Sequence, residues 1–288
     1  MLLLKIDGEF TDPSLPVIVR DPLLMGDNDG VRWLFDLAFP YSYAGNLPAQ
    51  DALIRDVSGH SNGKFNLSLG QSVGFNGNGF DFSTLVATSS GNDNCNVEAP
   101  AGVWSSISED QYFMVCFYVQ LTSEDDWNVD SNLFPIFGGS ELGYQVEADP
   151  LTIAQSSSTG VKVMSFRRQT GINTQLNTQV NPAAHFGKFT QIAFWRTAAG
   201  VSARLKSIDA TTITNAAVGA ANSLDLAPCR ARYGIVPPFT NFSIANHRTA
   251  KNFKLYRGFI EDLSLSERDP ASVLDADFAR VVSRDVFS

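Results

Sequence analysis

The sequence predicts an all-β fold, a large antiparallel β-sandwich followed by a short C-terminal helix. Segments rich in Val, Ile, Phe and Tyr recur along most of the 288 residues, and turns rich in Gly, Pro and Asp separate them. The strongest segment, residues 111–121, is apolar on both faces, as expected for a central strand that is covered on both sides. A helical pattern with clear boundary signals occurs near the end, at residues 270–282.

Composition and charge limit the possible classes of protein. Hydrophobic residues make up 44% of the chain and charged residues 18%, which indicates a globular protein with a large core. The net charge of −9 disfavours a direct nucleic-acid partner, because an acidic surface repels a phosphate backbone. No apolar run is long enough to predict a membrane-spanning helix, so no membrane partner is expected.

The N-terminus lacks the pattern of a secretion signal. The apolar start, residues 1–4, is interrupted by Lys5, so the run is too short for the apolar part of a signal peptide. We therefore expect the protein to fold in the cytoplasm where it is made. Cys95, Cys116 and Cys229 are an odd set without metal-ligand spacing, and we interpret them as reduced thiols.

The chain divides into three parts. Residues 1–24 are interpreted as a strand-forming arm, because two short apolar segments flank a turn at Asp7 and Gly8. A unit of two strands is marginally stable in water, so the arm is expected to pair with the main domain or with a neighbouring subunit. Residues 25–50 are rich in turn formers and are expected to connect the arm to the β-sandwich, residues 51–288.

The expected strands follow one another at about the spacing of a β-sandwich. Residues 225–235 and 242–246 lead back to the closing strand, and the expected strands lie at residues 65–69, 79–82, 111–121, 133–137, 143–147, 161–167, 189–197, 202–208 and 260–265. In the last of them Leu263 and Leu265 alternate with polar residues, as in a strand with one buried face. Residues 211–221 are small and lack a clean period, so they are expected to form a loop.

The terminal helix has both a start signal and an apolar stripe. Asp269 can cap its N-terminus with its carboxylate, and Pro270 suits the first helical position. Leu274, Phe278 and Val281 then recur at i, i+4 and i+7, which predicts a face that packs on the sheet. The charged residues between them are expected to face water, and they are Asp275, Asp277 and Arg280.

Three segments resemble motifs of one family. Residues 258–265, Gly-Phe-Ile-Glu-Asp-Leu-Ser-Leu, resemble the closing strand of laminin-G-like, concanavalin A-like jelly rolls, whose usual pattern is G-x-I-D-E-[VL]-x-[IL]. Residues 56–63 resemble the opening D-x-S-G-x-x-N-G turn of that family. Residues 189–196 resemble its W-x-x-[IV]-A strand, with Phe189 in place of Trp. The resemblance implies a concanavalin A-like (laminin-G-like) antiparallel jelly roll over roughly residues 51–283.

A variant of this motif suggests a biological setting. Residues 266–271, Ser-Glu-Arg-Asp-Pro-Ala, resemble the S-G-R-T-P-A segment of laminin-G-like proteins encoded among tail and capsid genes of tailed bacteriophages, although Glu267 and Asp269 depart from it. The resemblance implies a virion component, namely a decoration, fibre or tail protein assembled in the host cytoplasm. Its expected partners are other virion proteins and further copies of itself in a homo-oligomer, with a trimer as one form, and cell-surface glycans are a further expected ligand.

The alternative function is a soluble carbohydrate-binding, lectin-like module of a cellular protein. Such modules usually accompany a secretion signal or a catalytic domain, and neither pattern is found here. An enzyme is disfavoured, because the E-x-D-x-x-E strand of jelly-roll glucanases is missing and the adjacent Glu261 and Asp262 point to opposite faces of a strand. His60, His185 and His247 have no nucleophile-elbow motif nearby and are interpreted as turn or loop residues.

One loop has the composition of a ligand site. Residues 123–130 gather carboxylates around a Trp, and the candidate ligand residues are Glu124, Asp125, Asp126, Trp127 and Asp130. Such a loop can hold calcium through oxygen ligands and stack a sugar ring on the indole, as lectin sites do. The alternative is a solvated acidic hairpin whose Trp packs back onto the sandwich, and turns are rich in these residue types in any case. No other cofactor is expected.

Overall fold

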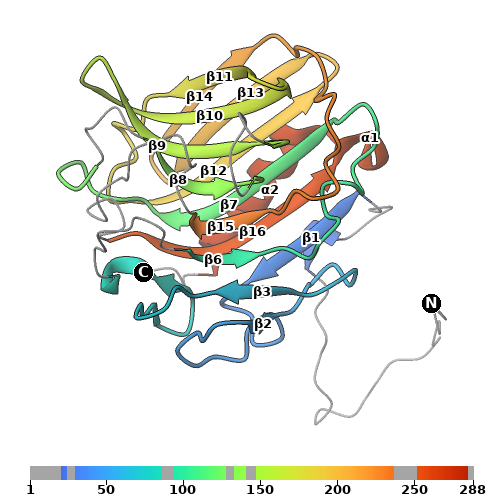
Figure 1. The fold of residues 1–288 in the computed structure, drawn as a ribbon. Helices are drawn as coiled ribbons and strands as arrows, with labels where there is room; N and C mark the ends of the chain where they lie inside the picture. Colours follow the sequence, from blue (N-terminus) through green and yellow to red (C-terminus); the bar gives the residue numbers. More distant parts are fainter. Residues whose placement is uncertain are drawn as a thin grey trace.

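The computed structural model describes residues 21–24, 30–85, 94–127, 133–140, 147–236 and 252–284. Two antiparallel sheets of eight strands each lie face to face, and a C-terminal helix packs on one of them (Figure 1). The predicted jelly-roll β-sandwich with a short C-terminal helix is therefore confirmed. Residues 1–20 of the expected arm, residues 143–146 of the expected strand 143–147, and residues 242–246 lie outside the described residues.

Sheet A contains the central strand of the fold. Its path is β14 (Ala210–Ala216), β13 (Gly200–Ser207), β12 (Phe189–Thr197), β7 (Phe113–Gln120), β16 (Lys254–Asp262), β5 (Phe80–Asp81) and β4 (Gly74–Phe75), and β1 (Val31–Asp36) also pairs with β16. Strand β7 lies inside this path, as its apolar character on both faces predicts.

Sheet B is built from strands that are spread over most of the chain. Its order is β11 (Thr174–Val180), β10 (Val161–Gly171), β9 (Thr152–Ser158), β8 (Phe134–Gly138), β15 (Arg232–Ile235), β6 (Cys95–Glu98), β3 (Gly63–Asn66) and β2 (Ala52–Ile54). Four helical segments complete the described structure: η1 (Pro22–Leu24), η2 (Phe82–Thr84), α1 (Leu263–Ser266) and α2 (Pro270–Ser283).

Alternation along β7 divides the apolar interior into two layers. Val115 and Phe117 point between the two sheets, whereas Cys116 and Tyr118 point to the opposite side, where α2 covers sheet A. All four side chains are buried. Cys116 is a small core residue without a disulfide, as predicted, and Cys95 and Cys229 are also free and buried.

The centre of the sandwich is an aromatic cluster that requires a glycine. The ring centroids of Phe137 and Tyr233 lie 4.8 Å apart, and Phe117 contacts both rings at 6.0 and 5.6 Å. A Cβ atom on Gly258 would lie 2.7 Å from the ring of Phe35 and 2.9 Å from that of Tyr233. Only glycine therefore fits at this position of the closing strand.

The turn at residues 56–63 fastens β1 to the sandwich. The carboxylate of Asp56 accepts hydrogen bonds from the backbone N–H groups of Leu34, Ser58 and His60. Residues 25–50, expected to connect the arm to the β-sandwich, thus include a strand of sheet A, β1. Leu24, expected to be part of the arm, also packs in the layer under α2.

Two further expectations need correction. Residues 211–221 were expected to be a loop, but β14 occupies most of that segment as the edge strand of sheet A, where β13 supplies its backbone partners. The closing strand ends at Asp262, whose carboxylate accepts from the backbone N–H of Ser264 and starts the short helix α1. Leu265 is consequently in a helix and exposed. Residues 225–235, expected to lead back to the closing strand, contain β15.

Helix α2 begins and packs as predicted, with one exception. The Asp269 carboxylate accepts from the backbone N–H of Ser272, and Leu274, Phe278 and Val281 are buried against sheet A. Asp277, expected to face water, is 3% exposed. It is buried because sheet A offers it partners, which are described below.

Candidate functional site

The loop expected to bind a ligand packs its aromatic residue inward. Trp127 is 3% exposed, its indole N–H donates to the carbonyl of Ser156, and its ring contacts that of Phe186 edge-on. Asp126 accepts from the Ser123 hydroxyl at 2.8 Å. Glu124 and Asp125 are also described, whereas Asp130 lies outside the described residues. No group of three or more His, Cys, Asp or Glu in the described residues has the arrangement of a metal site.

The packing of Trp127 leads to a prediction about calcium. We expect calcium to leave the melting temperature of the wild type unchanged, because Asp126 is paired with the Ser123 hydroxyl and the indole packs on Ser156 and Phe186. Trp127→Ala is expected to lower the melting temperature equally with and without calcium. Asp125→Asn is the matched variant that removes a loop charge and leaves the indole in place. A calcium-dependent rise seen in the wild type but not in Asp125→Asn would contradict this expectation.

A row of polar residues crosses the outer face of sheet B, the face that points away from sheet A. The side chains of Phe65, Val97 and Tyr233 point into the sandwich, so their strand neighbours point outward. The strand register aligns seven outward positions on adjacent strands, which we call the polar row: Asn177, Arg167, Thr152, Gly138, Arg232, Glu98 and Lys64. Thr152, Gly138 and Arg232 in the middle of the row are buried, so the row is open to solvent only towards its ends.

The middle of the polar row is a buried ion pair surrounded by amides. Arg232 Nε donates to Glu98 at 2.8 Å, and Arg232 is 4% exposed. Asn66, on the same face, donates to Glu98 at 3.0 Å and to Asn96 at 3.1 Å. The charges in this part are therefore compensated, and the amide groups are held in fixed orientations.

The end of the polar row at β10 and β11 is open to solvent. Asn177 is exposed and Arg167 is half-buried. Both are oriented by Ser165, which donates from its hydroxyl to Asn177 Oδ1 at 2.7 Å and accepts from Arg167 Nε at 3.1 Å. An exposed amide and a half-buried guanidinium are thus fixed beside one another by a buried hydroxyl.

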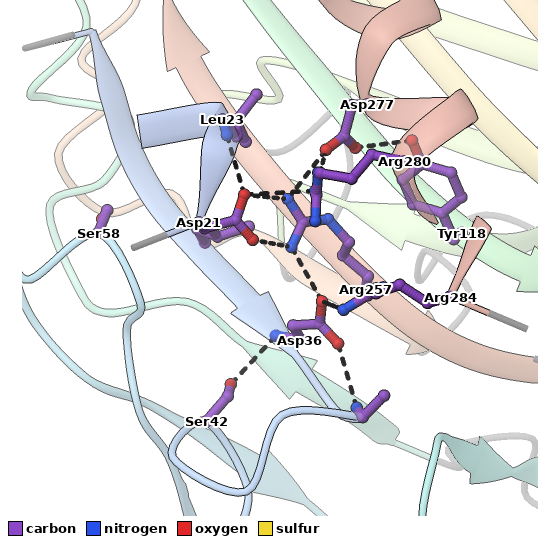
Figure 2. A network of polar contacts seen from close by, with 12 residues as sticks. Asp21, Leu23, Asp36, Ser42, Ser58, Tyr118, Arg257, Asp277, Arg280 and Arg284 are labelled. Atoms are coloured by element: carbon purple, nitrogen blue, oxygen red, sulfur yellow. Dashed lines mark hydrogen bonds and ion pairs between the residues drawn. The ribbon is translucent and has the colours of Figure 1, made fainter. Parts of the chain in front are cut away.

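A second polar cluster is buried on the other side of the molecule, under α2. The guanidinium of Arg257 is fully buried and contacts three carboxylates, at 2.8 Å from Asp21, 3.0 Å from Asp36 and 3.1 Å from Asp277 (Figure 2). Arg280 and Arg284 complete the cluster: Arg280 pairs with Asp21 and Asp277, and Arg284 with Asp36. Three positive and three negative charges therefore balance.

This cluster joins parts of the chain that are distant in sequence. Asp21 precedes η1, Asp36 ends β1, Arg257 belongs to β16 and Asp277 to α2. The hydroxyl of Tyr118 donates to Asp277 at 2.6 Å. Burial by itself raises the pKa of Asp277, but Arg257, Arg280 and the hydroxyl outweigh it, so the pKa is lowered. The cluster accordingly anchors residue 21, where the expected arm joins the sandwich.

The remaining candidate groups have structural partners. His185 is buried in a turn, with its two ring nitrogens 2.8 Å from the Ser207 hydroxyl and 2.9 Å from the Thr212 hydroxyl, and burial lowers its pKa. His60 lies in the turn at 56–63, and His247 is outside the described residues. Glu261 forms an ion pair with Arg268.

Comparison with known proteins gives a likeness of fold without a family. No protein-family model matches the sequence, and no curated protein has a significant match. The chain is similar to the CBM2 module of Lactobacillus casei BL23 phage J-1 evolved Dit, with 15% identity, 83% of this chain and 92% of that chain covered, and a TM-score of 0.37. It is also similar to lectin II from Ulex europaeus, with 13% identity, 74% and 94% covered, and a TM-score of 0.44.

An enzyme occurs among the similar structures as well. The alginate lyase from Klebsiella pneumoniae has 7% identity, with 68% of this chain and 81% of that chain covered, and a TM-score of 0.32. At identities and TM-scores this low, the likenesses carry no argument about ligand or activity. In the described residues no helix has the length and apolar character needed to cross a membrane.

Proposed function

We propose that the chain is a non-enzymatic structural component of a bacteriophage virion, a decoration, fibre or tail protein, whose β-sandwich binds glycans along the outer face of sheet B. The polar row is the observation that carries the glycan-binding part. The resemblance of residues 258–271 to phage laminin-G-like proteins supports the virion part. The other candidate, a lectin-like module of a cellular protein, would use the same face.

The chemistry of the polar row suits an uncharged or weakly charged polyhydroxyl ligand. Sugar hydroxyls both donate and accept, and at the open end of the row the amide of Asn177 offers both functions while the guanidinium of Arg167 donates. In the middle of the row the Glu98–Arg232 pair is buried and cancels its own charge. At the open end Asn177 and Arg167 are already oriented by Ser165, which lowers the entropic cost of binding.

A matched pair of variants tests this proposal. Asn177 accepts from Ser165 across β10 and β11 at 2.7 Å, and Asn215 accepts from Ser202 across β13 and β14 at 2.7 Å, but on sheet A. Asn177→Ala is expected to weaken glycan binding about five- to tenfold on an array of bacterial surface polysaccharides, the loss of roughly one hydrogen bond. Asn215→Ala is expected to leave it unchanged.

Two outcomes would contradict the proposal. Wild-type protein that binds no polysaccharide on the array, or equal losses in the two Asn variants, would exclude the polar row as a glycan site. Release of new reducing ends from a bound polysaccharide, abolished by Glu98→Gln, would exclude the non-enzymatic part.

Attachment to a particle is tested by deletion, and the structure fixes where the deletion must stop. Removing residues 1–20 leaves Asp21 paired with Arg257, so the domain is expected to keep its melting temperature but to become monomeric and absent from purified particles. Removing residues 1–21 also removes a buried counter-ion and is expected to lower the melting temperature. Light scattering and mass spectrometry of particles give the readouts. If the 1–20 deletion keeps the native mass and still enters particles, the arm is not the attachment element.

A further inference from the structure

A pocket lies at the edge of the sandwich where the two sheets meet. The edge strands approach each other there, since the hydroxyl of Thr214 on β14 donates to the carbonyl of Gln179 on β11 at 3.0 Å. The pocket has a volume of about 240 Å³. Its lining includes the apolar side chains of Phe166, Phe194 and Val201, and it also includes Arg168. At about 30 Å³ per water molecule, it offers the room of roughly eight waters, enough for one sugar ring.

Two arginines beside this pocket are buried without a carboxylate partner. Arg168 is 3% exposed and Arg196 is 4% exposed. Arg168 donates to the carbonyls of Val218 at 2.8 Å and Ala220 at 2.6 Å, and Arg196 donates to that of Gly219 at 3.1 Å. Neither forms an ion pair with any carboxylate in the described part of the chain. In this respect they differ from Arg257, which has three carboxylate partners.

The uncompensated charge has a physical cost. A guanidinium offers five N–H donors, and among the described residues Arg168 uses two of them, for the carbonyls of Val218 and Ala220. Burial and the neighbouring charge of Arg196 lower the pKa of Arg168 to about 10, so the group is still a cation at neutral pH. Burying a cation without a nearby counter-ion is unfavourable. The net charge of −9 belongs to the whole chain and does not remove this local cost.

A second cavity differs from the edge pocket in that its charged residues are paired. It has a volume of about 300 Å³ and lies between η1 and α2, where its charged lining residues, Arg268, Asp277 and Arg280, are all in ion pairs. A ligand there would have to break these pairs. At the edge pocket an anion would instead supply the missing partner.

We propose that the edge pocket binds a sugar residue that carries a carboxylate, with the carboxylate on Arg168 and the ring against Phe166 and Phe194. The ligand identity rests on the proposed glycan-binding function. Asn177 lines the pocket and also ends the polar row, so an acidic glycan on the outer face of sheet B can reach it. A carboxylate is the group that a planar guanidinium binds best, through two parallel hydrogen bonds.

The wall of the pocket explains a glycine in the sequence. Gly219 has a φ of +59°, and a Cβ atom there would lie 2.5 Å from Leu176 Cδ1 and 2.8 Å from Arg168 Nη2. Glycine thus lets the carbonyls of this segment approach the guanidinium and keeps the space in front of it free.

The test uses the full chain and two probes that differ in one group, glucuronate and glucose, titrated by calorimetry at low ionic strength. The wild type is expected to bind glucuronate at least about tenfold more tightly than glucose, and Arg168→Gln to lose that preference. Ala217→Leu fills the wall of the pocket at an exposed position, keeps both arginines and is expected to weaken glucuronate binding similarly. Arg55→Gln removes a guanidinium that also donates to a carbonyl, that of Tyr41, and is expected to change nothing.

Each remaining outcome overturns the inference. Equal binding of the two probes excludes carboxylate recognition, and equal losses in Arg55→Gln and Arg168→Gln indicate a general charge effect. If Arg168→Gln fails to fold, Ala217→Leu decides alone, and unchanged binding in that folded variant means that the arginines only fasten residues 218–220. The edge pocket and the outer-face function can fail separately. If array binding depends on Asn177 but the protein does not prefer glucuronate to glucose, only the pocket proposal is refuted. Glucuronate binding without any polysaccharide binding refutes only the outer-face function.

Discussion

Replacing Arg257 with methionine is expected to lower the free energy of unfolding by about 3–5 kcal/mol, the usual cost of removing one partner from a buried ion pair. Methionine fills much of the volume of the arginine stem but leaves Asp21, Asp36 and Asp277 without their shared cation (Figure 2). Arg280 and Arg284 compensate only in part, since both are more exposed and lie at the edge of the cluster.

Urea titration of the wild type and of Arg257→Met measures this loss. Arg55→Met is the matched control, because the same substitution at a more exposed arginine is expected to change stability by less than about 0.5 kcal/mol. Similar losses in the two variants would show that the buried cluster contributes nothing beyond an ordinary surface arginine.

The same cluster predicts a loss of stability in acid. The pKa of Asp277 is lowered in the folded protein, because its partners outweigh the effect of burial. A carboxylate with a lowered pKa stabilises the fold above its unfolded pKa, about 3.9, and this contribution is lost as the pH falls through the folded value. Asp277→Asn is therefore expected to be less stable than the wild type at pH 7, and the difference is expected to shrink towards pH 3.

Elements with a strong local pattern could be predicted from the sequence. Strand β12 has the predicted bounds, residues 189–197, and α2 starts at the predicted cap, because alternation and capping are local properties. Asp277 was placed on the wrong side because its partners are not local: Arg257 is 20 residues away, and Asp36 belongs to β1. A charged residue on an amphipathic helix is normally exposed, and only a buried cation reverses that preference.

The polar row and the edge pocket could not be predicted from the sequence for the same reason, because their residues are distant in the chain. Residues 123–130 could be proposed as a ligand site from the sequence because their carboxylates are neighbours in the chain. The polar row comes from seven strands, and alternation within one strand identifies its outward residues but not the residues beside them. The edge pocket depends on two arginines, Arg168 and Arg196, on different sheets. Neither site has a contiguous signal in the sequence.

Phe117→Ala is expected to lower the free energy of unfolding by about 3–5 kcal/mol, as truncation of a large buried aromatic residue does. The ring is fully buried, stacks on Phe137 at 6.0 Å and meets Tyr233 edge-on at 5.6 Å, so its removal leaves a cavity between the sheets. Its pairing partner on β16 is Gly258, which has no side chain with which to fill the space. Phe75→Ala, at a half-buried phenylalanine in the short edge strand β4, is the matched control and is expected to cost clearly less. A loss below about 1 kcal/mol for Phe117→Ala in a urea titration would show that β7 is not the centre of the core.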